Sequence, residues 1–349
     1  MRGLSKTDRM RAVVDGDVPD RTPVSFFQHH HAKETDPQIL ARHLAELNRK
    51  YDWDFVKVQS RPSLYAEAWG CKYRFHGSAP PHLEQHVVHG ASDLAELKRV
   101  SMTERPLSDH ILVCKLLREE FGGAVPVVQT TLSPLAVATR LAGNAPRDAS
   151  EPDRILRYMD EDAEALHRAL SAIADTLAEY ARSSIRAGAD GLFMTTSVWA
   201  TRNTMSEDKY EEFGRPYDVR VFEAAAGEGG WLNILHICKT HVMFALADEY
   251  PVAVINWDAW AEGNPTMQEA LRRSDKVLWG GIDQKAIALH DGPPETIGQG
   301  IQGQLEHIQR TLEMSGGARV IIGPGCVLPP EVPASRLDRV MQTIQDLED

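Results

Sequence analysis

The sequence predicts an α/β fold, a closed (β/α)8 TIM barrel that occupies residues 1–349 as a single domain. Eight short apolar segments have the length and composition of strands, and most of them are separated by helical patterns. The strand segments are nearly continuous apolar runs, which is typical of parallel strands covered by helices. Neither an internal repeat nor a low-complexity linker divides the chain.

The first half of the chain supplies three of the expected strands. In order, we expect a helix over 1–14, a strand over 22–29, a helix over 37–50, a strand over 55–59, a helix over 108–121 and a strand over 125–131. Residues 60–100 contain scattered Gly, Pro and His. We interpret them as a long irregular insertion after the second strand that covers the active site.

The second half supplies the other five strands. Ser133-Pro134 begins the next helix, because proline suits the first helical turn. We then expect a helical run over 153–187, a strand over 190–196, an irregular segment over 197–206, a helix through 210–221, strands over 231–238, 252–257, 277–282 and 319–322, and a helix after residue 333.

The composition argues against several classes of protein. A net charge of −12 argues against a nucleic-acid partner, because phosphate binding needs a basic surface. No run of about 18 apolar residues is present, so we expect no membrane span. The N-terminus lacks the apolar core of a signal peptide, and four cysteines in so long a chain do not resemble a disulfide framework. We therefore expect a cytoplasmic protein.

His236 and Cys238 lie at the end of the fifth expected strand. Residues i and i+2 of a strand point to the same side, so the imidazole and the thiol project together. Cys326, in the Gly-Pro-Gly-Cys turn after the eighth strand, adds a third soft ligand. One imidazole and two thiolates form a zinc site with an open fourth position, which is typical of catalytic sites. The alternative is an ordinary His and Cys buried in a core strand.

Polar side chains follow every expected strand, at the end where a TIM barrel has its active site. They are Gln28, His29, His30, His31, Gln59, Arg61, Gln129, Thr130, Thr195, Thr196, Ser197, His236, Cys238, Asn256, Asp258, Asp283 and Cys326. Arg61 either anchors a substrate carboxylate or pairs with a surface carboxylate. Asp258 and Asp283 either cap helices or orient a metal ligand. We interpret Cys71 and Cys114 as ordinary thiols.

These positions give three sets of candidate residues. The candidate catalytic residues are His29, His31, Arg61 and Asp283. The candidate cofactor contacts are Gln129, Ser197 and Asn256, and the candidate metal ligands are His236, Cys238 and Cys326. For the histidine run, residues 29–31, the alternative is a solvated loop.

Across nearly its whole length the chain resembles the uroporphyrinogen decarboxylase superfamily. The resemblance rests on Asp20-Arg21-Thr22-Pro23-Val24, Tyr65-Ala66-Glu67-Ala68-Trp69-Gly70, Ser133-Pro134-Leu135, Tyr210-Glu211-Glu212-Phe213 with Pro216-Tyr217, and Gly280-Gly281-Ile282-Asp283. Decarboxylases of that superfamily hold the porphyrinogen with two arginines and an aspartate, and have a histidine in the last strand's loop. At those positions this chain has Gln28 and Ala32, Arg61, and Gly325.

The His-x-Cys pair and the Pro-Gly-Cys turn are instead similar to the zinc-dependent corrinoid methyltransferases, such as the methylcobamide:coenzyme M methyltransferases. This resemblance implies Zn²⁺ on His236, Cys238 and Cys326, and transfer of a methyl group between a corrinoid and a thiol or similar acceptor. It implies that a thiolate attacks the methyl group of methylcobalamin and releases cob(I)alamin. Because the chain has no visible corrinoid-binding motif, the corrinoid is expected free or on a separate corrinoid protein.

Two other functions remain open from the sequence. One is a zinc lyase or hydrolase for a small carboxylate, with water at the open metal position, a histidine of residues 29–31 as the base, and Arg61 as the anchor. The other is a non-catalytic barrel that binds a tetrapyrrole or a corrinoid.

Overall fold

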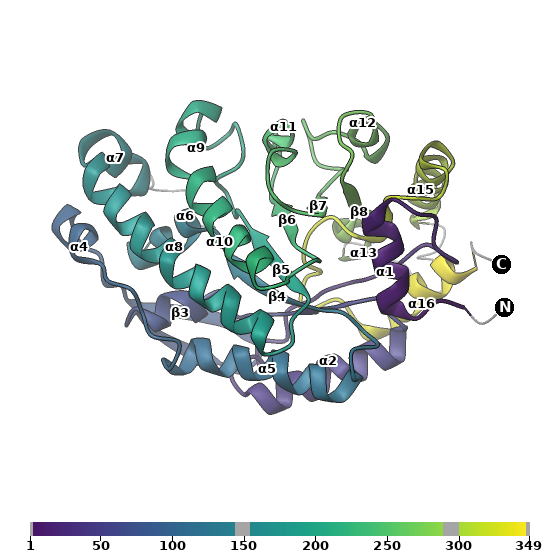
Figure 1. Ribbon diagram of the computed structural model, residues 1–349, viewed down its shortest axis with the longest axis horizontal. Coiled ribbons are helices and arrows are strands. Elements are labelled where there is room, and N and C mark those ends of the chain that lie inside the picture. The colour runs from purple at the N-terminus through teal and green to yellow at the C-terminus, as the bar shows by residue number, and fades with distance from the viewer. Residues whose placement is uncertain (1–2, 144–153, 289–299, 347–349) are drawn as a thin grey trace.

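Seven parallel strands form the central sheet of the computed structural model, which describes residues 3–143, 154–288 and 300–346. The strands, in their order across the sheet, are β1 (Val56–Val58), β4 (Val127–Leu132), β5 (Gly191–Thr195), β6 (Ile234–Ile237), β7 (Val254–Trp257), β8 (Val277–Ile282) and β9 (Val320–Pro324). Their order across the sheet is their order in the chain, with helices between them (Figure 1). This confirms the predicted TIM-barrel architecture.

An extended segment, residues 23–28, takes the place of the eighth strand and closes the barrel. Val24 forms a parallel bridge with Ile322 on β9. On the other side, the Val24 carbonyl accepts a hydrogen bond of 2.8 Å from the Asp54 N–H, just before β1. The strand predicted over 22–29 is therefore present as isolated bridges rather than a regular ladder, and Pro23 contributes to this because it has no N–H to donate.

Helices cover the outside of the barrel (Figure 1). Those of twelve or more described residues are α2 (Pro37–Tyr51), α5 (Arg105–Phe121), α8 (Ala163–Arg186), α10 (Arg215–Gly227), α15 (Gln302–Ser315) and α16 (Ala334–Gln345). α8 and α10 lie side by side (Figure 1), and Arg220 on α10 pairs with Asp175 on α8 at 3.1 Å. The shorter helices are α1 (Lys6–Asp15), α3 (Leu64–Ala68), α4 (Ala91–Glu96), α6 (Pro134–Leu141), α7 (Arg154–Glu161), α9 (Glu207–Phe213), α11 (Phe244–Ala247), α12 (Met267–Leu271) and α13 (Gln284–Ala288).

Two helices expected to be continuous are divided. The run predicted over 153–187 becomes α7 and α8, because Asp162 has a non-helical φ of −141° and ψ of 43°; Asp153 lies outside the described residues. The helix predicted through 210–221 becomes α9 and α10. Gly214 divides it, since Pro216 lacks the N–H that a continuing helix needs and instead starts α10. The helix predicted over 1–14 is α1, with its first two residues outside the described part.

The insertion after β1 is more regular than predicted. It contains α3, an antiparallel hairpin of β2 (Lys72–His76) and β3 (Ala79–Gln85), and α4. Gly77, with a φ of 56°, lies in the turn and suits a tight hairpin connection. The Phe75 ring lies 5.7 Å from the Arg61 guanidinium, so the hairpin lies beside the barrel mouth. The sequence suggested a loop because the hairpin carries Gly and Pro and exposes most of its side chains.

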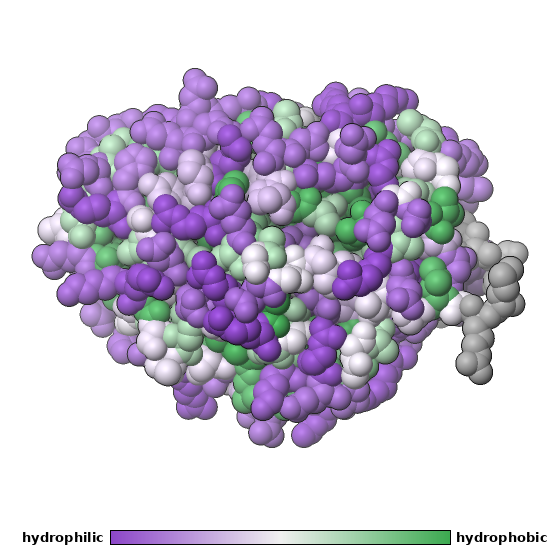
Figure 2. Space-filling model, viewed as in Figure 1, coloured by the Kyte–Doolittle hydropathy of each residue, from purple (hydrophilic) through white to green (hydrophobic). Residues whose placement is uncertain are grey.

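Aromatic side chains fill one layer of the barrel interior. Phe27, Phe55, Phe193 and Trp279 contact one another with ring centroids 4.8 to 5.8 Å apart. The outer surface is different: the face in Figure 2 is mostly hydrophilic, with apolar residues scattered over it. Among the described helices, none combines the length and apolar character needed to span a membrane.

Asp218 on α10 is a buried carboxyl without a cationic partner among the described residues. Its Oδ2 accepts hydrogen bonds from the hydroxyls of Tyr210 and Tyr250, at 2.7 and 2.9 Å. Burial raises the pKa of Asp218 to about 7, although the two hydroxyls oppose this rise. In the unfolded chain an aspartate titrates near pH 3.9. Between about pH 4 and pH 7 the folded state therefore holds an extra proton, and stability falls as the pH rises.

Replacing Asp218 by Asn is expected to remove this pH dependence. The wild-type free energy of unfolding should fall relative to the variant by up to about 1.4 kcal/mol per pH unit in that window. Chemical denaturation at pH 5, 6 and 7 measures the difference, with the exposed Asp17→Asn as the control. If the free energy of unfolding changed with pH in the same way for wild type and Asp218→Asn, the carboxyl would be ionised in the folded state and the prediction would be wrong.

Candidate metal centre

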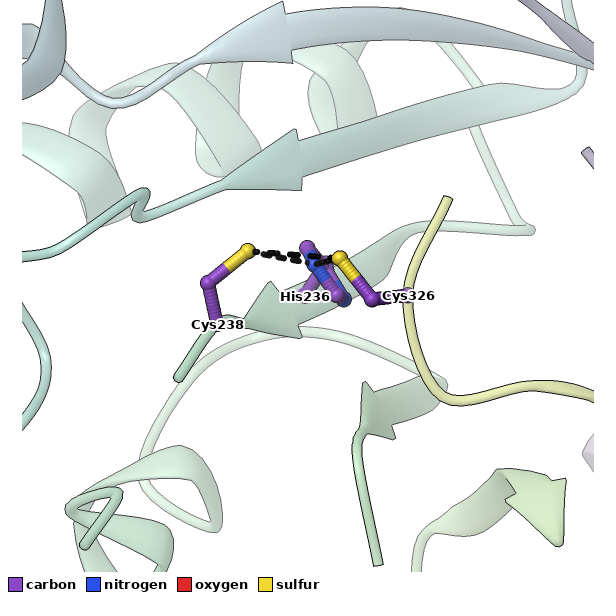
Figure 3. Close-up of side chains that lie close together, drawn as sticks. All are labelled: His236, Cys238 and Cys326. Carbon is purple, nitrogen blue, oxygen red and sulfur yellow. Dashed lines mark hydrogen bonds between the residues drawn. The ribbon is translucent and has the colours of Figure 1, made fainter. Parts of the chain in front are cut away.

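Three soft donor atoms converge at the carboxyl-terminal end of the barrel. Nε2 of His236 on β6 lies 2.7 Å from the sulfur of Cys238 and 3.6 Å from that of Cys326, and the two sulfurs are 3.9 Å apart. Figure 3 shows the three side chains pointing toward one another from β6 and the turn after β9. The predicted convergence of strands five and eight is therefore present in the structure.

The donor atoms fit a single metal ion. Tetrahedral zinc with ordinary bond lengths separates a nitrogen from a sulfur by about 3.5 Å and two sulfurs by about 3.8 Å. The Cys326 distances of 3.6 and 3.9 Å match these values, whereas His236 and Cys238, at 2.7 Å, must move slightly apart to hold the same ion. One imidazole and two sulfurs favour a soft or borderline cation such as zinc.

The contact between the two cysteines shifts the pKa values of their thiols in opposite directions. The thiol of Cys326 lowers the pKa of Cys238 by hydrogen bonding to its sulfur, and the Thr195 hydroxyl, 3.7 Å from that sulfur, adds to the effect. The same contact raises the pKa of Cys326, because a second thiolate beside the first is unfavourable. A divalent cation between the sulfurs removes this conflict.

Asn256 on β7 lies next to His236 in the sheet, since the two residues are register partners. Its amide nitrogen donates to the carbonyls of Trp279 and Pro324, at 2.8 and 3.1 Å. Asn256 Oδ1 and His236 Nδ1 are both buried without a hydrogen-bond partner among the described residues. A histidine that binds a metal through one nitrogen normally donates from the other. Asn256 is the neighbouring residue that offers a free acceptor.

Cys326 is held in place by its backbone. Its N–H donates to Gln284 Oε1 at 3.1 Å, and Gln284 in turn donates to Asp258 at 3.1 Å. Gly325 packs so closely that a Cβ there would lie 2.5 Å from the Asp258 Cα. Lys285 also pairs with Asp258, at 2.9 Å. Asp258 thus anchors the turn that carries Cys326, and it also accepts a hydrogen bond of 3.1 Å from the Trp260 N–H.

His29 and His31 form a second cluster with Glu34, and their ligand-type atoms lie within 4.8 Å of one another. The Nδ1 atoms of the histidines donate to the two Glu34 oxygens at 3.0 and 3.2 Å. Burial lowers the pKa of His29, although Glu34 opposes the shift. Burial alone would raise the pKa of Glu34, but the histidine hydrogen bonds outweigh it and hold the pKa below its usual range. The histidine run is therefore partly buried rather than a solvated loop.

A polar connection links this cluster to the barrel interior. The side-chain nitrogen of Gln59 lies 3.1 Å from His29 Nε2, and the Gln59 oxygen accepts a hydrogen bond of 2.6 Å from Lys57 Nζ. Lys57 points into the barrel, above the rings of Phe27 and Phe193. Lys57 is not among the candidate residues predicted from the sequence, although the alternation of strand residues places it on the same side as Gln59.

A sequence profile described as uroporphyrinogen decarboxylase (URO-D) matches residues 5–347. The chain belongs to the uroporphyrinogen decarboxylase family. Over 292 residues it is 22% identical to the methylcobamide:CoM methyltransferase MtbA of Methanosarcina acetivorans, covering 83% of this chain and 79% of that protein. Over 195 residues it is 25% identical to the uroporphyrinogen decarboxylase of Cellvibrio japonicus, covering 56% of this chain and 52% of that protein. A solved methyltransferase from Methanosarcina mazei superposes with a TM-score of 0.81 and 18% identity, covering 99% of this chain and all of that one.

In uroporphyrinogen decarboxylases, the resemblance assigns certain positions to porphyrinogen binding. In this chain, Gln28 and Arg61 at those positions form hydrogen bonds with other parts of the protein. The Gln28 amide donates to the Pro329 carbonyl at 2.6 Å. Arg61 donates through two nitrogens to Glu67, both at 2.8 Å, and through its third to the Glu34 carbonyl at 2.9 Å. Arg61 therefore pairs with a carboxylate of the chain itself, although Glu67 is partly buried and not the surface carboxylate of the prediction.

The remaining predicted residues are not brought to the metal centre. Gln129 is fully buried and lies toward the helix layer, where it accepts from Cys114 and donates to Tyr180. The Asp283 carboxylate accepts from the Lys285 N–H at 2.8 Å, as a helix cap does. The Ser197 N–H donates to Thr195, and it is Thr195 that contacts Cys238. All three residues lie near the end of a strand, but this position alone does not fix the direction of the side chain.

Proposed function

We propose that this enzyme is a zinc-dependent methyltransferase that moves a methyl group between a corrinoid and a thiol or similar acceptor. The observation that carries the proposal is the convergence of His236, Cys238 and Cys326 at the barrel mouth. Three protein ligands leave a fourth position for a substrate. The name of one relative, a methylcobamide:CoM methyltransferase that aligns with 83% of this chain, supports the same reaction.

The residues of the centre have distinct proposed roles. His236, Cys238 and Cys326 hold the zinc, which when bound acts as a Lewis acid that lowers the pKa of a thiol. Asn256 Oδ1, which has no hydrogen-bond partner among the described residues, is the proposed acceptor for the outer nitrogen of His236 when the metal binds. The Thr195 hydroxyl forms a hydrogen bond with the Cys238 sulfur and lowers the basicity of that sulfur. His29 and His31 line the mouth beside the insertion, where the corrinoid enters.

The corrinoid is proposed to arrive free or on a separate protein. Free thiolate ligands require a reducing compartment, and all four cysteines of the chain are free, so we place the protein in the cytoplasm. The test is anaerobic demethylation of methylcobalamin by the zinc-loaded protein and a panel of thiols, followed through the absorbance of cob(I)alamin.

The hydrolase or lyase alternative has less support. It requires Arg61 to anchor a substrate carboxylate, but three Arg61 nitrogens already donate to Glu67 and to the Glu34 backbone. The non-catalytic alternative is set aside, because the chain belongs to a family of enzymes.

The protein is expected not to decarboxylate uroporphyrinogen. Gln28 and Arg61 are engaged by other parts of the chain, and at Gly325 a side chain would collide with Asp258. Anaerobic incubation with uroporphyrinogen, followed by chromatography of the oxidised porphyrins, measures the activity. A uroporphyrinogen decarboxylase assayed in parallel is the positive control. Formation of coproporphyrinogen above the no-enzyme level would contradict the expectation.

A further inference from the structure

Lys57 places an amine inside the barrel with little to pair with it. The residue is 4% exposed, and its Nζ has one hydrogen-bond acceptor, Gln59 Oε1 at 2.6 Å. The amine also lies over the rings of Phe27 and Phe193, whose centroids are 4.7 and 4.4 Å away. Among the described residues, no carboxylate lies within ion-pair distance of it. Burial of an ammonium without a nearby anion costs free energy. The Lys57 amine is therefore favoured either as the neutral form or as the charged form with an anion bound nearby.

The candidate metal centre lies next to Lys57, on the other side of the Phe193 ring. The Phe193 ring that contacts Lys57 also stacks on the His236 imidazole, with centroids 5.2 Å apart. The titratable groups that act on Lys57 are Glu34 and His29 from the segment after residue 28, and Cys238 and Cys326 from the ends of β6 and β9. Burial lowers the pKa of Lys57 to about 7, although Glu34 and the two cysteines oppose this shift. Near neutral pH the group therefore changes charge easily.

We propose that the Lys57 amine takes up a proton when a thiolate binds at the metal centre, and that the resulting ammonium balances the charge of the loaded centre. The proposal rests on the proposed function. A zinc ion with two cysteinates is neutral, and a further thiolate makes the site an anion. In a closed interior, a cation one ring away stabilises that anion far more than it would in water.

The proton balance is simple. The S–H bond of the incoming thiol breaks, its electron pair stays on sulfur and binds the metal, and the proton ends on the Nζ lone pair of Lys57, directly or through solvent. Nothing is oxidised or reduced. Lys57 does not contact the ligand atoms, so it acts through charge, as a positioning residue.

Calorimetry in buffers of different ionisation enthalpy tests this on the zinc-loaded, full-length protein, with 2-mercaptoethanol as the probe. At pH 6 Lys57 is already charged, so the thiol should release about one proton to the buffer; at pH 8 the release should fall toward zero.

Lys57→Met should release about one proton at both pH values and bind the thiol roughly 10-fold more weakly. Lys57→Arg keeps the charge, so it should bind with near wild-type affinity yet still release about one proton at pH 8. The exposed Lys115→Met is the matched control.

A second readout does not depend on binding heats. In ¹⁵N-labelled protein, the Lys57 side-chain resonance, identified by its loss in Lys57→Met, should change from amine to ammonium on addition of the thiol at pH 8. Thiol binding with one proton released at both pH values in the wild type, or an unchanged resonance, overturns the role of Lys57 and leaves the methyltransferase proposal standing. Absence of any thiol binding to the zinc-loaded wild type overturns the proposed function, and the role of Lys57 with it.

Discussion

Cys238→Ser and Cys326→Ser are expected to lose the bound zinc. Wild-type protein should carry about one zinc ion per chain, because one set of His and Cys ligands converges. Replacing a sulfur by a hydroxyl substitutes a hard, protonated ligand for a soft thiolate. Loss of residues that merely orient ligands costs 10–100-fold in affinity, so loss of a ligand should cost more than roughly 100-fold. Elemental analysis after dialysis against a weak chelator measures the content.

The chain offers two matched controls for this experiment. Cys71 and Cys114 are buried and free, and burial raises the pKa of both thiols, so they are poor metal ligands. Cys71→Ser and Cys114→Ser should keep full zinc, and circular dichroism verifies that all four variants are folded. Wild-type zinc content in both Cys238→Ser and Cys326→Ser would remove the metal centre from the proposed function.

Thiol-dependent demethylation of methylcobalamin is expected for the wild type and should fall by roughly 100- to 1,000-fold in Cys238→Ser. Lewis-acid activation of a thiol contributes several kcal/mol, and each 1.4 kcal/mol corresponds to about a tenfold change in rate. In the proposed mechanism the two cysteinates would partly neutralise the metal, so that the bound thiol sulfur would stay nucleophilic. Cob(I)alamin formation, measured anaerobically by absorbance, reports the reaction.

A cobalt-substituted enzyme provides an independent view of the same step. Its visible spectrum should change when the acceptor thiol is added, and the change should be absent in Cys326→Ser. Failure of a broad thiol panel both to perturb this spectrum and to demethylate methylcobalamin, free or protein-bound, would refute the methyltransferase proposal. Hydrolysis or cleavage of small carboxylates would then be the reaction to test.

The strands, and the common side of the candidate metal ligands His236 and Cys238, could be predicted because both depend on local patterns. The buried strands are continuous apolar runs, and His236 and Cys238 share a side by simple alternation. The hairpin in the insertion could not be predicted this way, since its side chains are mostly exposed and carry no alternating apolar pattern. The break at Asp162 is equally invisible, because the residues on both sides of it continue a helical pattern.

The other candidate residues show that a position near a strand end does not by itself predict which side chains lie at the site. Gln129 follows Val128, which packs inside the barrel, so alternation directs Gln129 outward to Cys114 and Tyr180. The same rule places Lys57 with Gln59, on the inner side. Applied residue by residue, alternation would have removed Gln129 from the candidates and added Lys57. Glu34 is different, because its contact with His29 and His31 depends on a turn that the sequence does not specify.

Because residues 23–28 close the barrel by pairing with the last strand, the three candidate ligands can come together only after nearly the whole chain has been synthesised. That segment pairs with β9, and the Gln28 amide reaches a carbonyl 301 residues later in the sequence. During synthesis the early strands emerge first, and the ring stays open until the last strand has left the ribosome. Cys326 directly follows that strand, so the third sulfur arrives with the closing step. A chain that ends before Cys326 therefore has only two of the three candidate ligands, and we expect the proposed metal to bind as one of the last events of folding.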